Sequence, residues 1–145
     1  MPEGPLVLDT SVAAAWFFVD EPHRQEALGV RADLRDRPER FVVPALFHSE
    51  LLHVLARKSG RDLAFVREAL ALVLRLGIRT LPLSDAALAA AARWACRGMS
   101  GYDATFVGLA EDLGGRWLTA DARAARVVGA RRAVLLASEH RARQG

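Results

Sequence analysis

The sequence is poor in the residues that define several common classes of protein. Among 145 residues it has one cysteine, Cys96, and one lysine, Lys58. A single cysteine excludes an intrachain disulfide, and the four histidines form no Cys/His cluster with zinc-site spacing. Cys96 lies in an alanine-rich helical stretch, so we expect it to be a small buried side chain rather than a reactive thiol.

Long apolar runs are also missing. No stretch approaches the roughly 20 residues of a membrane-spanning helix, and the segment Met1–Pro5 lacks the basic start of a signal peptide. The 52% hydrophobic content is enough for a compact core. We therefore expect one cytoplasmic domain over residues 1–145, with its core over about 6–136 and a polar tail over about 137–145.

The positive charge is concentrated near the C-terminus. The chain carries a net charge of +3. Residues 116–145 hold seven arginines and two acids, a net of +5, whereas residues 1–115 hold thirteen basic and fifteen acidic side chains, a net of −2. This distribution suits a polyanionic partner such as nucleic acid, and a solvated arginine-rich surface explains it equally well.

Short apolar strands alternate with helices along the chain. We predict strands at 6–8, 41–43, 78–83 and 116–119, and leave a fifth at 133–136 open. We predict helices at 12–19, 21–35, 45–58, 61–76, 85–97, 100–113 and 121–128. This alternation indicates a mostly parallel sheet of four to five strands with helices on both faces. Ligands of such sheets bind beyond the carboxyl ends of the strands.

Four aspartates stand where an ordinary structural role is open to them. Asp9 ends the first strand in the run LVLDTSV, and Asp121 follows the fourth strand. Either could cap the helix that comes next, because aspartate is favoured at that position. Asp103 completes a capping box that begins at Ser100, with aspartate in place of the usual glutamate. Asp85, beside Ser84, is predicted to begin a helix.

Glu50 is harder to explain as a structural residue. It lies in the middle of the helix predicted at 45–58, on the same face as Phe47 and Val54. A carboxylate there is costly to bury without a partner. Either an arginine forms an ion pair with Glu50, or Glu50 belongs to a functional site. Asp103 raises the same question, because Phe106 follows it at helical spacing on an apolar face.

Two acids at the strand ends and two acids on helices facing the sheet should meet at one edge. Carboxylates brought together raise one another's pKa, and a divalent cation relieves that repulsion. Oxygen ligands without histidine or cysteine suit Mg²⁺ or Mn²⁺. Such an ion activates water against a phosphodiester. The pattern therefore indicates metal-assisted hydrolysis of phosphodiesters.

Four segments in fixed order also resemble a known family. They are LVLDTSV, VPALFHSELLHVL, GYDATFVGLAEDLG and RWLTAD, spread over about Leu6 to about Leu136. Together they resemble the PIN-domain ribonucleases, and especially the VapC-like toxins of type II toxin–antitoxin systems. The resemblance implies a three-layer α/β/α sandwich and a metal-dependent endoribonuclease that uses Mg²⁺ or Mn²⁺. It also implies a homodimer and a small antitoxin protein that covers the active site.

The resemblance assigns roles residue by residue. The family's metal-binding acids, which are also its catalytic groups, fall on Asp9, Glu50, Asp103 and Asp121. The family relies least on the fourth. Ser11 and Thr119 match positions that support the site through hydrogen bonds. Candidates for contact with RNA phosphates, or for a solvated surface, are Arg116, Arg123 and Arg126. The aromatic run Trp16–Phe18 is a candidate for the dimer surface or for the core.

Rival classes fit the sequence less well. A phosphoacceptor receiver domain and a haloacid-dehalogenase-like phosphatase both need a late lysine, but the only lysine, Lys58, precedes the midpoint. A di-iron bundle needs paired Glu-x-x-His motifs, and only Glu50 and His53 form one. Two alternatives within the same fold stay open: a PIN nuclease of RNA processing or decay without an antitoxin, and a non-catalytic RNA- or protein-binding module.

Overall fold

Five parallel strands form the centre of the molecule. The computed structural model describes residues 4–136, so the polar tail predicted over 137–145 lies outside the described residues. The strands run in the order β3-β2-β1-β4-β5, and every neighbouring pair is parallel. They are β1 (Leu6–Leu8), β2 (Phe41–Pro44), β3 (Arg79–Leu81), β4 (Arg116–Thr119) and β5 (Ala133–Leu135). The predicted sheet is confirmed, and the fifth strand is present.

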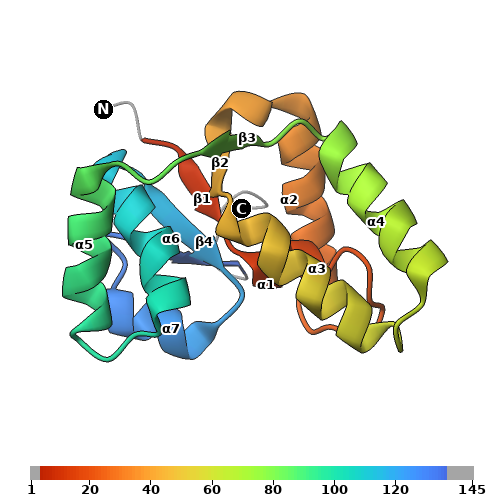
Figure 1. The fold of residues 1–145 in the computed structure, drawn as a ribbon. Coiled ribbons are helices and arrows are strands. Elements are labelled where there is room, and N and C mark those ends of the chain that lie inside the picture. Colours follow the sequence, from red (N-terminus) through yellow and green to blue (C-terminus); the bar gives the residue numbers. More distant parts are fainter. Residues whose placement is uncertain (1–3, 137–145) are drawn as a thin grey trace.

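Helices cover both faces of the sheet and complete the three-layer α/β/α sandwich (Figure 1). From β1 the chain adds β2 and then β3 on one side, and afterwards returns to β4 and β5 on the other. Right-handed crossovers therefore place the early and late helices on opposite faces. The helices are α1 (Thr10–Ala14), α2 (Arg24–Asp36), α3 (Leu46–Lys58), α4 (Leu63–Arg75), α5 (Asp85–Ala95), α6 (Gly101–Asp112) and α7 (Ala122–Val128), with a 3₁₀ turn at Pro38–Arg40.

The central strands are buried on both faces. Val7 of β1 and Trp117 of β4 have no exposed surface. Helix α6 crosses β1, β2 and β4, and α5 packs on α6. Burial on both sides explains why these strands read as continuous apolar runs instead of alternating ones. Within residues 4–136, no helix combines the length and the apolar character needed to cross a bilayer.

The first helix is shorter than predicted. We expected it over 12–19, but α1 ends at Ala14 and the aromatic run Trp16–Phe18 lies in the turns that follow. The Trp16 indole nitrogen donates to the Ala27 carbonyl oxygen of α2 at 2.7 Å, and its side chain is buried. This bond draws the chain back toward α2 and ends the helix early. Phe17 and Phe18 are partly buried against the core.

The expectation that Cys96 lies in the core is wrong. Helix α5 buries Ala87, Ala90, Ala91 and Trp94, which share one face. Cys96 comes two residues after Trp94, which rotates it by about 200° to the opposite side of the helix. Its side chain is exposed. Asp85, in contrast, begins α5 behind the N-cap Ser84, as predicted.

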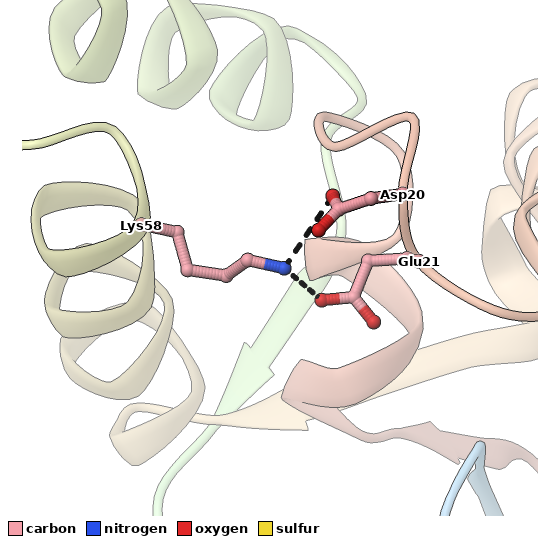
Figure 2. A network of polar contacts seen from close by, with 3 residues as sticks. All are labelled: Asp20, Glu21 and Lys58. Atoms are coloured by element: carbon pink, nitrogen blue, oxygen red, sulfur yellow. Dashed lines mark hydrogen bonds and ion pairs between the residues drawn. The ribbon is translucent and has the colours of Figure 1, made fainter.

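The only lysine joins two parts of the chain that are distant in sequence. Lys58, at the end of α3, forms ion pairs with Glu21 and, at 3.8 Å, with Asp20, as Figure 2 shows. Its ammonium nitrogen also lies 4.7 Å from the ring centroid of Phe18. Less than a third of the Lys58 and Glu21 side chains is exposed, so solvent screens this pair less than a surface pair. The connection between α1 and α2 is thereby held against α3.

Gly108 marks the close contact between α6 and α5, and it gives a test of the packing. A Cβ there would lie 2.6 Å from the Ala87 carbonyl oxygen and 2.7 Å from the Ala91 nitrogen. We expect Gly108→Ala to lower the free energy of unfolding by about 1–3 kcal/mol, because backbone atoms cannot yield and the overpacking outweighs the gain in helix propensity. Denaturant unfolding measures this change.

Gly101 is the matched control in the same helix. A Cβ at Gly101 meets nothing within 4 Å, so Gly101→Ala should leave stability unchanged or raise it slightly. Equal stability of the two variants would contradict the close contact between the helices.

Candidate active site

Asp9 is fixed at the carboxyl end of β1. Leu8 pairs with Leu118 of β4, and the Asp9 backbone nitrogen donates to the Leu118 carbonyl oxygen at 2.9 Å. The side chain is only 7% exposed. It also caps α1, because Asp9 Oδ2 accepts from the Ser11 backbone nitrogen at 3.3 Å. The cap expected from sequence is therefore real, and it leaves the carboxylate at the edge of the sheet.

Two hydroxyl groups orient the Asp9 carboxylate. Ser11 donates a short hydrogen bond from Oγ to Asp9 Oδ2, and Thr119 Oγ1 donates to the same oxygen at 3.1 Å. Both hydroxyl oxygens in turn accept from backbone nitrogens after β4, those of Ala120 and Asp121, each at 3.1 Å. Every hydrogen bond that the described residues give this carboxylate goes to Oδ2, which leaves Oδ1 available to a ligand.

Glu50 projects from α3 toward α1. Thr10 Oγ1 donates to Glu50 Oε1 at 3.1 Å. The sequence left open an arginine partner for Glu50, but in the described part of the chain no basic side chain forms an ion pair with it. Burial raises the pKa of Glu50, the charge of Asp103 raises it further, and the bond from Thr10 partly lowers it.

Asp103 lies in the first turn of α6. Ser100 is the N-cap, and its Oγ accepts from the Asp103 backbone nitrogen at 3.0 Å. The serine half of the predicted capping box is therefore present. Burial raises the pKa of Asp103 to about 6 from the ordinary 3.8, and the charges of Asp9 and Asp121 contribute to the rise. Asp9, Asp103 and Asp121 are therefore near enough to interact electrostatically.

Asp121 is the most exposed of the four predicted acids. It caps α7, because its Oδ1 accepts from the Ala124 backbone nitrogen at 3.1 Å. It follows Thr119 by two residues, so the end of β4 brings it toward Asp9. Its charge reaches Asp103. The structure thus gathers acids from the ends of β1 and β4 and from α3 and α6.

The chemistry of this donor set fits a hard divalent cation. Asp9, Glu50 and Asp103 all have raised pKa values, and burial and mutual repulsion are the causes. Carboxylate oxygens are the ligands that Mg²⁺ and Mn²⁺ prefer. Over residues 4–136, no three His, Cys, Asp or Glu side chains are already arranged as a ligand set. The acids therefore offer suitable donors without forming a ready-made cage.

The three predicted phosphate contacts are divided between two regions. Arg123 is exposed in the first turn of α7, close in sequence to Asp121. Arg116 begins β4, so about 10 Å of strand separates it from the carboxyl edge where the acids lie. Arg116 and Arg126 line a hollow of about 540 Å³ between α7 and β5. Arg116, Arg123 and Arg126 are all close to Asp121 in sequence, but they do not all lie beside the acids.

Sequence reasoning missed one feature of the site. A hollow of about 400 Å³ opens beside Glu50 and is lined by Ser49, Glu50, His53, Val54 and Tyr102. Two signals could have revealed it. Tyr102 directly precedes Asp103, and His53 lies one helical turn after Glu50.

The family assignment agrees with this geometry. The family model of the PIN domain matches residues 6–130, which is most of the chain. The protein belongs to the PIN-domain family, a class of nucleases. A search of the curated proteins gives no match.

Several solved structures share the fold at low sequence identity. VapC20 from Mycobacterium tuberculosis, a sarcin–ricin loop cleaving toxin, is 20% identical with a TM-score of 0.63, over 83% of this chain and 94% of that chain. PAE2754 from Pyrobaculum aerophilum is 19% identical with a TM-score of 0.70, over 98% and 91%. FitAcB from Neisseria gonorrhoeae is 18% identical with a TM-score of 0.69, over 90% and 96%. These likenesses establish the fold.

The raised pKa of Asp103, caused first by burial and then by the charges of Asp9 and Asp121, predicts a dependence of stability on pH. Its folded pKa of about 6 exceeds the ordinary 3.8, so the folded state holds this proton more tightly than the unfolded state does. The contribution of Asp103 to stability is therefore present below about pH 4 and is lost as the pH rises to about 6. Without metal, we expect Asp103→Asn to be more stable than wild type at pH 7.5 by about 1 kcal/mol, a figure reduced for solvent screening.

Urea unfolding at pH 7.5 and pH 4 measures this difference, which should disappear at the lower pH. Asp85→Asn is the control, because Asp85 is exposed in the first turn of α5, outside the cluster. A less stable Asp103→Asn at pH 7.5 would show that burial and repulsion do not destabilise the charged form of Asp103.

Proposed function

We propose that the protein is a metal-dependent endoribonuclease that hydrolyses phosphodiester bonds in RNA. The observation that carries the proposal is the meeting of Asp9, Glu50 and Asp103 at one edge of the sheet. Their pKa values are raised, and no ion pair within the described residues neutralises them. Membership of the PIN-domain family supports nuclease activity.

In this proposal the four acids hold Mg²⁺ or Mn²⁺, with Asp121 in the most peripheral place. A bound divalent ion supplies an activated water and stabilises negative charge on the phosphate. Asp9 is the best-fixed ligand, because Ser11 and Thr119 hold its Oδ2 and leave Oδ1 available. Thr10 limits the rotation of Glu50 through one carboxylate oxygen. Arg123 is the nearest in sequence of the predicted arginines to Asp121 and is suited to contact a phosphate.

We further propose that the protein is the toxin of a toxin–antitoxin pair. Support comes from the fold it shares with VapC20, a toxin that cleaves the sarcin–ricin loop, and with FitAcB. In this proposal it acts in the cytoplasm as a homodimer, and a small antitoxin protein covers the acids. A PIN nuclease of RNA processing or decay without an antitoxin is the alternative. A small neighbouring reading frame with a DNA-binding N-terminus would favour the toxin.

RNA cleavage tests the catalytic assignment directly. With Mg²⁺ or Mn²⁺ present, we expect Asp9→Asn and Asp103→Asn to cut RNA at least ~100-fold more slowly than wild type, because each removes a negatively charged ligand. Excess chelator should stop cleavage by the wild type. Gel analysis of a labelled RNA measures the rates.

Asp85→Asn is the matched control for cleavage, and it should retain wild-type activity. If the two site variants cut RNA as fast as wild type, the assignment of the acids is wrong. If chelator leaves activity intact, the metal mechanism is wrong.

Growth tests the toxin assignment separately. Expression of the wild-type chain without a partner should arrest growth, and Glu50→Gln should relieve the arrest because the neutral amide is a poor ligand for a divalent ion. Colony counts at equal protein level, checked by immunoblot, measure the effect. If Glu50→Gln arrests growth as strongly as wild type does, toxicity does not depend on the acidic site.

A further inference from the structure

An exposed aromatic side chain borders the acidic site. Tyr102 is the only tyrosine, and 64% of its surface is exposed. It lies in the first turn of α6, immediately before Asp103. It faces the hollow of about 400 Å³ beside Glu50, whose other walls are Ser49, His53 and Val54 of α3. A large apolar ring thus stands largely in solvent next to two of the proposed catalytic acids.

The fold does not account for the position of this ring. Tyr102 belongs to no buried cluster, and within the described residues it stacks on no other aromatic ring. Aromatic side chains that remain exposed beside a nucleic-acid site serve as platforms for unpaired bases. The hollow adds an apolar wall from Val54 and hydrogen-bonding groups from Ser49 and His53.

A second, basic hollow adjoins the first. It measures about 530 Å³ and is lined by His53, Ala56, Arg57, Gly60 and Arg61. His53 lines both hollows. Arg57 and Arg61 are exposed, and in the part of the chain that the structure describes neither forms an ion pair. Two cationic groups are therefore available to an anion at this place.

Helical spacing connects the two hollows in a line. Glu50, His53 and Arg57 follow one another at three and four residues, so they share one face of α3. Seven residues of helix separate Glu50 from Arg57 by about 10 Å. Along this face the surface passes from the Glu50 carboxylate to the hollow beside Tyr102 and then to Arg57. A nucleotide strand has the same order, with one phosphate at the acids, a base in the hollow and the next phosphate at the arginine.

We propose that the two hollows form one track for single-stranded RNA along α3. Resting on the proposed ribonuclease function, this assignment makes Tyr102 the platform for one unpaired base beside the acids. Arg57 and Arg61 bind the phosphates of adjacent nucleotides. A single strand is required, because the bases of an RNA duplex are stacked within the helix and cannot enter the hollow.

The base platform is tested by binding without cleavage. The probe is a short single-stranded RNA containing 2-aminopurine, whose fluorescence falls when it stacks on an aromatic ring, titrated in chelator. We expect quenching with wild type and with Tyr102→Phe. Tyr102→Leu should lose the quenching and bind about tenfold more weakly. Leu88→Ala, which alters another exposed apolar side chain, should resemble wild type.

Unchanged quenching with Tyr102→Leu would overturn the base platform. Because Tyr102 is mostly exposed, its variants should keep the wild-type melting temperature, which separates lost binding from lost folding.

The phosphate part of the track is tested by the salt dependence of the same binding. Arg57→Ala and Arg61→Ala should each weaken binding of any RNA sequence and should reduce the slope of log affinity against log salt by about 0.7. Arg79→Ala is the control. Arg79 is exposed at the amino end of β3, whereas the acids lie at the carboxyl ends of the strands. If Arg126→Ala lowers the slope and Arg57→Ala does not, the strand lies over α7 and the proposal is wrong.

The track and the catalytic proposal can fail independently. Binding that depends on Tyr102 and Arg57, together with no metal-dependent cleavage, would leave the track standing and overturn the ribonuclease. Metal-dependent cleavage with a KM that is unchanged in Tyr102→Leu would overturn the track alone.

Discussion

Burial and mutual repulsion of carboxylates at the carboxyl edge of the sheet are the constraint on which the candidate site depends. Burial alone would disfavour the charged forms of Asp9, Glu50 and Asp103, and each also feels the charge of another acid. A fold that needed only stability would replace such groups or pair them with arginines, of which the chain has many. Within residues 4–136, no basic side chain forms an ion pair with these acids, and a divalent ion would complete such an arrangement.

The same residues that create the repulsion also begin helices. Asp9 caps α1 and Asp121 caps α7. A cap must lie where a strand has just ended, and in a parallel sheet that place is the ligand-binding edge. One carboxylate can therefore satisfy a backbone nitrogen with one oxygen and leave the other without a hydrogen bond from the described residues, as Asp9 does. The structural and catalytic interpretations of Asp9 are compatible, because they use different oxygen atoms of the same group.

Much of this arrangement could be predicted because it depends on local patterns. Apolar runs located the strands, and the acids at their ends followed from chain direction. Two predictions failed, one because of a contact distant in sequence and the other because of an angular position on a helix. The bond from Trp16 to Ala27 shortened α1, and the angular position of Cys96 on α5 placed it outside the core. Tyr102 and Glu50 belong to two helices that are far apart in sequence, so the hollow between them follows only when the neighbours of two predicted acids are combined, Tyr102 before Asp103 and His53 after Glu50.

The end of α3 links the stability of the fold to the geometry of the site. Two basic residues stand there side by side, and the structure gives them different partners. Lys58 turns to Glu21 and Asp20 and holds the α1–α2 connection against the helix (Figure 2).

Arg57 lines the basic hollow and forms no ion pair with the described residues. The Lys58 contacts fix α3, and Thr10 of α1 fixes Glu50 on that same helix. Because α3 carries both Glu50 and Arg57, holding it at both points also sets the distance between the acids and the proposed phosphate contacts. The single lysine, remote from the acids, therefore helps to define the geometry of the site.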